Sequence, residues 1–401
     1  MRAQTTMDLE HAWSGLPLLR DMETACAGPD SGKNYWEKAF YWEHRATAES
    51  LVGNHGTASV YGAKVTRHHP DGLPARVALP SSATATAALP YIVGRAARHR
   101  VVMVNERHLV STDRLLTLAL LRPLYGQGFR HLAVEALWRG QTGLNERGYP
   151  IRESGFYASD VVFAELLREA IALGYRVVPY EASQEQGQAT DTLNDLQARD
   201  YWQARNLIAA TLDLDPEAKV LVHSGLAHIE EAVSPGWWPM GHYFREETGL
   251  DPLTVDQTLL AERGTDDFEH GWRVDAESRG LIQDGPVVLL DGEGDLLQIE
   301  PDRVDIRVLN PRTQFVAGRP AWMGMGGRRR PVQVDTAECA EDACVVSAFD
   351  VRWGDRAVPY DRVETGTAAV NLYLPQDAEM ELRGHRLDGT LVFRRLLTTP
   401  P

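Results

Sequence analysis

The feature that most constrains the fold of this chain is a series of short apolar segments, each separated from the next by a longer amphipathic one. Between residues 100 and 225 the apolar segments read RVVMVN, HLAVEA, YRVVPYE and KVLVHSG. The stretches that separate them read TDRLLTLALLRPLYGQG, ASDVVFAELLREAIALG and LQARDYWQARNLIAATLDL. Apolar strands without polar alternation, joined by crossovers of helical length, are typical of parallel sheets covered on both faces. We therefore expect an α/β fold whose mostly parallel sheet is flanked by helices.

Residues that commonly begin and end helices stand at the borders of the amphipathic segments. Ser111 and Thr112 precede the first helix and Ser159 precedes the second, where a hydroxyl group can accept from the free backbone N–H groups of the first turn. Gly128 and Gly174 follow these helices, and glycine readily adopts the left-handed conformation that ends a helix. These residues support the alternation of strands and helices.

The segments on either side of this core differ in character, and the one after it predicts a second, smaller domain. Before it, NYWEKAFYWEHRATAESLV indicates a helical extension, and HHPDGLP indicates a loop or hairpin in which His68 and His69 are exposed. After it, the polar stretch RGTDDFEHGWRVDAESRG is a candidate linker. Beyond residue 281 short apolar or alternating runs separated by turn residues favour a small antiparallel sandwich or barrel. We expect an α/β domain over residues 1–280 and an antiparallel β domain over residues 281–401.

The composition excludes several classes of partner. The chain has 56 acidic and 41 basic residues, and its formal net charge of −15 disfavours binding to nucleic acid or to an anionic membrane. The basic cluster Arg328 to Arg330 lacks the strand and helix of a phosphate-binding loop, so a solvated turn is the simpler interpretation. No apolar run is long enough to span a membrane, and the N-terminus lacks the core of a signal peptide. We expect a cytoplasmic protein, or a periplasmic or secreted one if a leader was removed. The sequence predicts no particular oligomeric state.

Two cysteines in the β-rich region have two possible states. Cys339 and Cys344 are close enough in the chain to form one short disulfide, and they can equally remain unlinked thiols. Three cysteines in 401 residues do not make a disulfide framework.

Acids and imidazoles stand where each of the four predicted strands ends. In an open parallel sheet, ligands bind outside the carboxyl ends of the strands because loops and helix N-termini converge there. The residues are Glu106 and His108 after the first strand, Glu135 after the second, Glu181 after the third, and His223 and His228 at the fourth. Buried carboxylates and imidazoles are unfavourable unless they are paired or bound to an ion. We therefore expect these side chains to meet at one edge of the sheet.

Two kinds of chemistry suit such a cluster. In one, Glu106, His108 and His228 hold a divalent metal ion whose bound water becomes a nucleophile. In the other, no metal is present, and His108 or His228 acts as a general base on water while a glutamate orients the imidazole ring and another polarises the substrate. The sequence alone leaves both open.

Two further residues are candidates for the same edge. Arg199 stands at the start of a predicted helix, where a cation is electrostatically disfavoured, so we expect it to pair with Glu106 or Glu135. Tyr157 precedes the second crossover helix and can reach the same place, although aromatic residues in such loops often serve packing alone.

The order of these motifs resembles a known superfamily, the one that joins erythromycin esterases, TIKI and TraB proteases and haem-binding ChaN-like proteins. The resemblance covers the chain from about Arg100 to Glu230 and is carried by VVMVNERH, LAVEA, ARDYWQARNLIAATL and KVLVHSGLAHI. In that superfamily a strand ends in Gly-Glu-x-His or Gly-Glu-x-x-His, a second strand ends in Glu, a helix begins with an Arg-Asp/Glu pair, and a late strand leads to a His. The matching residues are Glu106 and His108, Glu135, Arg199 with Asp200, and His228. Asn105 stands where the family usually has glycine.

The resemblance implies a hydrolase that activates water and acts on a small-molecule ester, a lactone or a peptide. The expected catalytic residues are Glu106, His108, Glu135, Arg199 and His228. The expected substrate contacts are Asp200, which matches the family pattern, Glu181 and His223, which rest on their places at strand ends alone, and Tyr157, which rests on its place in a loop. A divalent metal ion is a possible cofactor. The alternative is a ChaN-like protein that binds haem or another planar ligand without turnover. A third alternative is a scaffold that has lost its activity.

Overall fold

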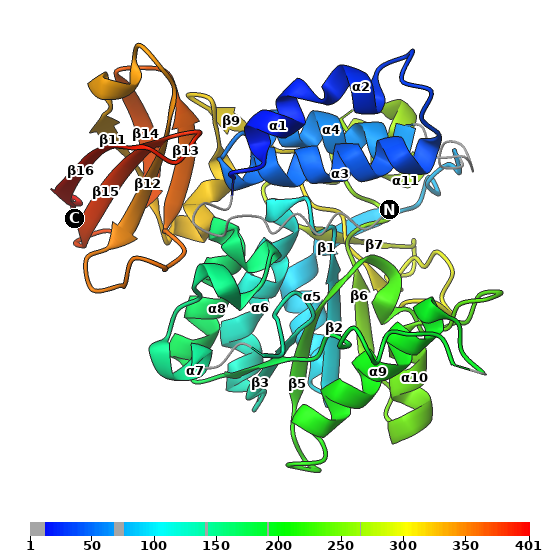
Figure 1. Cartoon of the computed structure of the whole chain (residues 1–401). Helices are drawn as coiled ribbons and strands as arrows, with labels where there is room; N and C mark the ends of the chain where they lie inside the picture. The colour runs from blue at the N-terminus through cyan, green and yellow to red at the C-terminus, as the bar shows by residue number, and fades with distance from the viewer. Residues whose placement is uncertain (1–12, 68–75, 141–142, 191, 265) are drawn as a thin grey trace.

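A six-stranded parallel sheet forms the centre of the protein (Figure 1). The structure is a computed structural model that describes residues 13–67, 76–140, 143–190, 192–264 and 266–401. In spatial order the strands are β4 (Arg176–Pro179), β3 (His131–Val134), β5 (Val220–Gly225), β2 (Val101–Glu106), β6 (Leu253–Asp256) and β8 (Ile306–Arg307), and all neighbours run parallel. The predicted α/β fold is confirmed.

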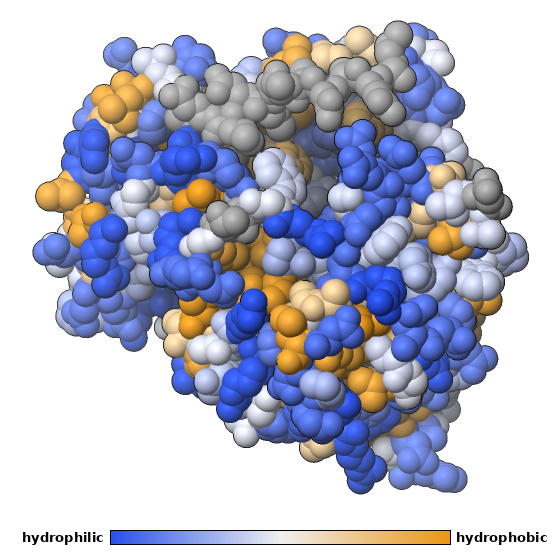
Figure 2. Space-filling model, turned by 60° about the horizontal axis from the view of Figure 1, so that its bottom comes forward, coloured by the Kyte–Doolittle hydropathy of each residue, from blue (hydrophilic) through white to orange (hydrophobic). Residues whose placement is uncertain are grey.

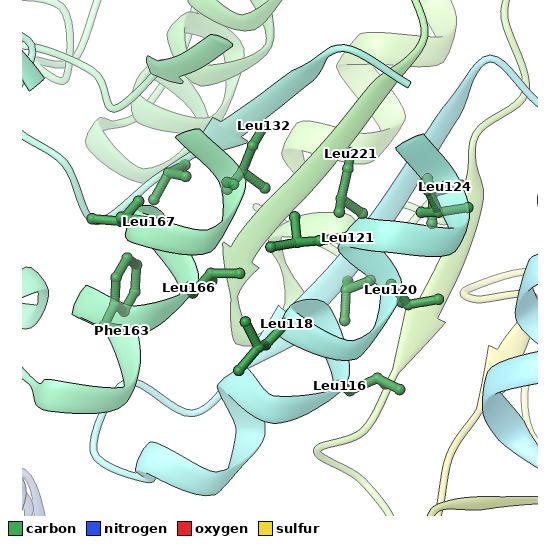
Figure 3. Close-up of a cluster of buried hydrophobic side chains, with 14 of the residues drawn as sticks. Leu116, Leu118, Leu120, Leu121, Leu124, Leu132, Phe163, Leu166, Leu167 and Leu221 are labelled. Atoms are coloured by element: carbon green, nitrogen blue, oxygen red, sulfur yellow. The ribbon is translucent and has the colours of Figure 1, made fainter. Parts of the chain in front are cut away.

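Helices cover both faces of this sheet, as the uninterrupted apolar strands predict. Val102 and Val104 of β2 pack in one buried cluster with helices α5 (Ala88–Ala96), α6 (Arg114–Gly126) and α8 (Val161–Leu173). Val101 and Met103 point to the other face and pack in a cluster with α9 (Asp195–Ala210) and α10 (Met240–Thr248). Figure 3 shows the first cluster, in which leucines of α6 and α8 meet Leu132 and Leu221 of the sheet.

The helix borders follow the predicted chemistry with shifts of a few residues. Ser111 lies in a short 3-10 helix before α6, and the residue that caps α8 is Asp160, not Ser159. The carboxylate of Asp160 accepts from the backbone N–H groups of Val162 and Phe163, and a carboxylate at this place also opposes the positive end of the helix dipole. Gly174 ends α8 in the left-handed conformation, with a φ of 97°.

A layer of helices from the N-terminal extension lies above the carboxyl ends of the strands (Figure 1). It contains α1 (Leu16–Asp21), α2 (Glu23–Ala27), α3 (Tyr35–Leu51) and α4 (His55–Arg67). The stretch expected to be a linker contains the short helix α11 (Gly271–Ser278), whose Trp272 and Arg273 are buried. That stretch is therefore packed structure and not a linker. The predicted exposure of His68 and His69 lies outside the described residues.

The pairing of strands continues past residue 281, the predicted domain boundary. Strand β1 (Thr84–Ala87) pairs antiparallel with β7 (Val287–Leu290), and β8 joins the central sheet. Thus the first strands beyond residue 281 are joined to the α/β part. Two short elements lie in the loops between the larger ones. They are α7 (Leu144–Arg147), between β3 and α8, and the hairpin of β9 (Phe315–Val316) with β10 (Arg319–Pro320), between β8 and β11.

The C-terminal residues form antiparallel sheets, as expected. One sheet has the order β13 (Asp361–Thr365), β12 (Cys344–Asp350), β15 (Glu379–Arg386) and β16 (Leu391–Thr398); the other pairs β11 (Arg330–Asp335) with β14 (Ala369–Leu374). Leu372 and Leu374 share one buried cluster with Val346 and Leu382, so side chains of both sheets form a common core. A disulfide joins Cys339 to Cys344, which decides between the two predicted states.

Arginine side chains tie the C-terminal sheets to the rest of the protein. The guanidinium of Arg20 bridges Glu49 of α3 and Glu364 of β13, with N–O distances of 2.6–3.1 Å. Arg328 and Arg329 pair with Glu169 and Glu165 of α8. The basic cluster therefore anchors the β part. Arg329 is buried and not solvated as predicted, whereas Arg328 is paired and partly exposed.

The surface carries many polar side chains. Figure 2 shows one face of the molecule, where hydrophilic residues predominate and hydrophobic residues gather near the middle. Among the described helices, none combines the length and the apolar character that crossing a membrane requires.

Candidate functional site

The carboxyl ends of β2, β3, β4 and β5 bring the predicted polar residues together at one edge of the sheet. Parallel pairing of β2, β3 and β4 with their neighbours places the ends of these strands side by side. The residues linked there by direct contacts are Glu106, His108, Glu135, Tyr157, Glu181, Arg199, Asp200, His223 and His228. The convergence expected from the sequence is therefore present, and it joins side chains far apart in the chain.

Glu106 lies fully buried at the centre of an ion-pair network. Its Oε2 accepts from Nε of Arg114 at 2.7 Å and contacts Nε2 of His223 at 3.0 Å. Its Oε1 contacts Nδ1 of His108 at 2.7 Å. Burial alone would raise the pKa of Glu106, but the charge of Arg114 and the neighbouring imidazoles hold this pKa well below its usual range. Glu106 is therefore an ionised anchor that orients His108.

His108 is held as an imidazolium between two carboxylates. Its Nδ1 contacts Glu106, and its Nε2 lies 3.7 Å from Oε1 of Glu135. Burial lowers the pKa of His108, but the two carboxylates outweigh this effect and raise it to about 10. The ring of Tyr157 stacks on the imidazole, with centroids 4.4 Å apart. Near neutral pH His108 can therefore donate a proton but cannot accept one.

Glu135 presents one oxygen to each side of the site. Its Oε2 accepts from the backbone N–H of Gly225 at 2.5 Å and from the hydroxyl of Ser224 at 3.1 Å. Its Oε1 accepts from Arg199 at 2.7 Å and lies 3.8 Å from Nε2 of His228. Both imidazole Nε2 atoms of the site thus face the same carboxylate oxygen.

Arg199 pairs with carboxylates, as expected for a cation near the N-terminus of a helix. It donates to Glu135, one of the two predicted partners, and in addition makes two hydrogen bonds to Glu181, at 2.6 and 3.1 Å. Gln203, one turn further along α9, also donates to Glu181. The side chain of Arg199 retains 35% of its exposure, so its guanidinium is accessible from the pocket.

Asp200 and His228 form a second pair of carboxylate and imidazole. Oδ1 of Asp200 lies 2.6 Å from Nδ1 of His228, and the same carboxylate accepts from the indole N–H of Trp237 and from the backbone N–H of Met240. Nε2 of His228 lies 2.9 Å from the guanidinium of Arg199. Because a guanidinium only donates, this contact describes the neutral ring with its proton on Nδ1.

The basicity of His228 is increased by its surroundings. Burial lowers its pKa, yet the charges of Glu135 and Asp200 outweigh burial and the opposing charge of Arg199, so the pKa of His228 is raised. The Nε2 atom is therefore a better proton acceptor than that of a free imidazole.

A pocket of about 350 Å³ opens above these groups. Its lining includes His108, Glu135, Glu181, Arg199 and His228, and also Tyr157 and Trp138. Glu106, Asp200 and His223 are buried and do not line it. The first two hold the imidazoles from behind. His223, which we expected to contact substrate, lies beneath Glu106 against Thr117 and Phe163.

The donor atoms do not fit the metal site considered from the sequence. Across the described part of the chain, no group of three or more His, Cys, Asp or Glu side chains is arranged to hold a metal ion. Both oxygens of Glu106 are engaged by Arg114 and imidazole nitrogens.

Several residues that shape the site were not foreseen. Arg114 in the first turn of α6, Trp237 after β5, and the Ser224–Gly225 pair all contact the predicted acids. The spacing of eight residues between Glu106 and Arg114 is a signal that could have been used, because the strand leads directly into that helix. Asn105 stands where the family resembled usually has glycine. Its side-chain amide is buried and forms hydrogen bonds with Asp256 and with the backbone of Gln257.

Comparisons with known proteins give structural neighbours and no sequence family. No protein-family model and no curated protein matches the chain. Among solved structures, the type III effector HopBA1 has a TM-score of 0.32 at 15% identity, over 55% of this chain and 91% of that one. ChaN of Campylobacter jejuni, described with cofacial haem binding, has a TM-score of 0.33 at 10% identity, over 56% and 92%. The MARTX toxin effector domain RRSP of Vibrio vulnificus has a TM-score of 0.32 at 14% identity, over 65% and 56%.

These neighbours include ChaN, one of the proteins named by the resemblance in the sequence. At such TM-scores the similarities carry no inference about function. Membership of the superfamily stays a prediction, and the case for function rests on the site itself.

The state of His108 predicts how stability depends on pH. Since the pKa of His108 is raised from 6.5 in the unfolded chain to about 10 in the folded one, its contribution is complete below pH 6.5 and is lost as the pH rises through 10. Between pH 7 and pH 10 the wild type should lose about 2 to 4 kcal/mol more free energy of unfolding than His108→Gln, which does not titrate. Urea denaturation of both proteins at the two pH values measures the difference. Equal losses would contradict the charged state.

The close approach of Gly225 to His108 gives a second prediction. A Cβ at Gly225 would lie 2.4 Å from Nε2 of His108, although the backbone φ of −81° suits any residue. Gly225→Ala should therefore lower the free energy of unfolding by about 1 to 3 kcal/mol through overpacking alone. Gly94→Ala in α5, where a Cβ meets open space, should leave stability unchanged or slightly raised. Urea denaturation compares the two variants, and a Gly225→Ala protein as stable as the wild type would disprove the tight contact.

Proposed function

We propose that the protein is a hydrolase in which His228 is the general base and His108 the general acid. The observation that carries this proposal is the symmetry of the two imidazoles. Each has its Nδ1 on a buried carboxylate, at 2.7 Å for Glu106 and 2.6 Å for Asp200, and each turns its Nε2 toward Oε1 of Glu135. Acid–base catalysis requires one group that donates a proton and one that accepts it; Nε2 of His228, in contact with the guanidinium of Arg199, carries the lone pair, and His108, whose pKa is raised to about 10, carries the proton.

His228 is suited to activate water. Asp200 fixes its proton on Nδ1, so the lone pair of Nε2 faces the pocket toward Arg199. When Arg199 turns to the carbonyl oxygen of a substrate, this lone pair is free to accept a proton from water. The water oxygen then forms the new bond to the carbonyl carbon, and the guanidinium stabilises the charge that develops on the carbonyl oxygen.

His108 completes the reaction. Its Nε2–H donates a proton to the leaving oxygen or nitrogen as the bond from that atom to the carbonyl carbon breaks. The cycle ends when the proton gained by His228 replaces the one lost by His108. Glu135, whose Oε1 lies 3.7 and 3.8 Å from the two Nε2 atoms, is placed to pass this proton between them.

The charges of the pocket favour a neutral carbonyl compound. The carboxylates of Glu135 and Glu181 balance Arg199 and the imidazolium of His108, and all four groups line the pocket. Without a net positive charge, the pocket offers no electrostatic advantage to an anionic substrate. Esters, lactones and peptide bonds remain the substrate classes of the proposal.

The alternative of a haem or planar-ligand protein receives no specific support from the donor atoms. An iron ligand needs a free imidazole lone pair. His108 is an imidazolium, and Nε2 of His228 is in contact with Arg199. Iron binding would therefore require His108 to lose a proton or Arg199 to move away from His228.

A hydrolysis assay tests the proposal. The wild type should hydrolyse at least one of a neutral 4-nitrophenyl ester, an aromatic lactone or a fluorogenic peptide, and the rate should fall about 100-fold or more in His108→Gln. The control is His44→Gln, because His44 is an exposed histidine on α3, and this variant should keep the wild-type rate. Turnover that is equal in His108→Gln and in the wild type would refute the assignment.

A further inference from the structure

A second pocket of about 350 Å³ lies behind the first, under the N-terminal helices. Its walls come from α3, α4, the loop between β2 and α6, and Trp322 after the β9–β10 hairpin. His108, Tyr157 and Leu226 line both pockets. The two spaces therefore meet at the stacked pair of His108 and Tyr157.

The second pocket offers mainly apolar walls, with charged side chains, among them Glu43 and Arg107, in part of its lining. Ala58, Ala63, Leu109 and Val110 are among its lining residues. The guanidinium of Arg107 also lines it but makes two hydrogen bonds to Asp113, at 2.7 and 2.8 Å. A neutral, mainly apolar ligand suits such walls.

His55 leaves a buried hydrogen-bond acceptor in this pocket. His55 is 8% exposed, and its Nε2 has no hydrogen-bond partner among the described residues. The chain of hydroxyl groups behind it fixes the proton: Ser111 donates to Asp160 at 2.6 Å, so Ser50 donates to Ser111 at 2.8 Å and accepts from Nδ1 of His55 at 3.4 Å. Burial lowers the pKa of His55 to about 3, so the ring is neutral and its Nε2 carries a lone pair.

Trp322 adds a buried donor beside this acceptor. Its indole N–H likewise has no partner in the described parts of the chain, and its ring lies edge to face with His55, with centroids 4.8 Å apart. A buried polar atom without a hydrogen bond destabilises the structure unless a ligand or water satisfies it. An acceptor and a donor left open side by side match the two hydrogen-bonding functions of an alcohol.

We propose that the second pocket binds a neutral, mainly apolar ligand through a hydroxyl group that donates to Nε2 of His55 and accepts from the indole N–H of Trp322. If the proposed hydrolase function holds, this ligand is the part of the substrate that does not react, and it reaches the catalytic groups past Tyr157. That link rests on the proposed function. The binding site itself does not.

A pair of matched probes tests the site by calorimetric titration of the full chain. 4-Phenylbutan-1-ol and butylbenzene differ by the hydroxyl group. The alcohol should bind about tenfold more tightly, since one satisfied hydrogen-bonding group is worth about 1 to 1.5 kcal/mol. Trp322→Phe keeps an aromatic ring and removes the N–H, so the preference for the alcohol should fall at least threefold while the hydrocarbon binds as before.

The control is Trp238→Phe, because Trp238 is exposed and does not line this pocket; it should keep the preference. His55→Phe should reduce the preference as Trp322→Phe does. Three results would each overturn the proposal: equal affinity for the two probes, absence of binding, or a preference that Trp322→Phe leaves intact. Nε2 of His55 and the indole N–H of Trp322 would then be satisfied by water alone. Because no turnover is measured, an inactive protein that prefers the alcohol would refute the hydrolase but not the site.

Discussion

Replacing Glu106 by glutamine should lower the free energy of unfolding by about 3 to 5 kcal/mol, because it leaves the charge of Arg114 without its nearest partner in the interior. Arg114 is 1% exposed, and among the described residues it would retain Asp160, at 3.1 Å, as its ion-pair partner. Glutamine has nearly the shape of glutamate, so the effect reports on charge and not on a cavity. Urea denaturation near pH 7 measures it.

Glu181→Gln is the matched control for this prediction. Glu181 also pairs with an arginine, but its side chain is 28% exposed, and partly exposed pairs contribute about 0 to 1 kcal/mol. A change of less than 1 kcal/mol is therefore expected. If the two variants lost the same stability, the buried network around Glu106 would not have the importance that we assign to it.

Hydrolysis should fall by a factor of about 10² to 10⁴ when His228 is replaced by glutamine, the range typical for removal of a general base. The glutamine amide can still donate to Asp200, so the hydrogen bond at 2.6 Å has a substitute and the fold should persist. The loss should appear in kcat, because the base acts in the chemical step and not in binding. Steady-state kinetics on whichever model substrate the wild type hydrolyses gives the numbers.

His242→Gln provides the comparison for the His228 variant. His242 lies on the neighbouring helix α10 and contacts the backbone carbonyl of Glu231, but it does not line the pocket. Its replacement should change kcat less than twofold. A His228→Gln protein with the kcat of the wild type would assign the base to another group.

Much of the fold could be predicted from the sequence because the signals were local and strong. Uninterrupted apolar runs marked β2, β3, β4 and β5, and each was found. Two shorter strands were not placed correctly. The segment that contains β8 was expected in the antiparallel domain, but it pairs in parallel with β6 of the central sheet, and β1 was missed. Strand β8 has two residues, and the sequence of β1 is TATA, which has little apolar character. Such strands depend on their partners in the sheet, so their own residues carry little signal.

The position of the site could be predicted from the sequence, but not which of its side chains line the pocket and which lie buried beneath it. The rule that parallel strands end at a common edge brought Glu106, Glu135 and Glu181 together, although the rule says nothing of depth. Alternation along β5 could have shown that His223 points into the core. His223 shares a face with Leu221, which packs beneath α6 and α8. The partners of the acids, such as Arg114, could not be assigned without knowing how the helices pack.

The protonation states of His108 and His228 can be measured by nitrogen-15 NMR of the histidine rings as a function of pH. Both ring nitrogens of His108 should carry protons from pH 7 to pH 9, and the ring should titrate near 10. His228 should lose its Nε2 proton at lower pH than His108 and keep its proton on Nδ1, and His108→Gln and His228→Gln assign the two sets of signals. A His108 ring that titrates at or below 6.5, the ordinary value of histidine, would contradict its role as the acid held by Glu106 and Glu135.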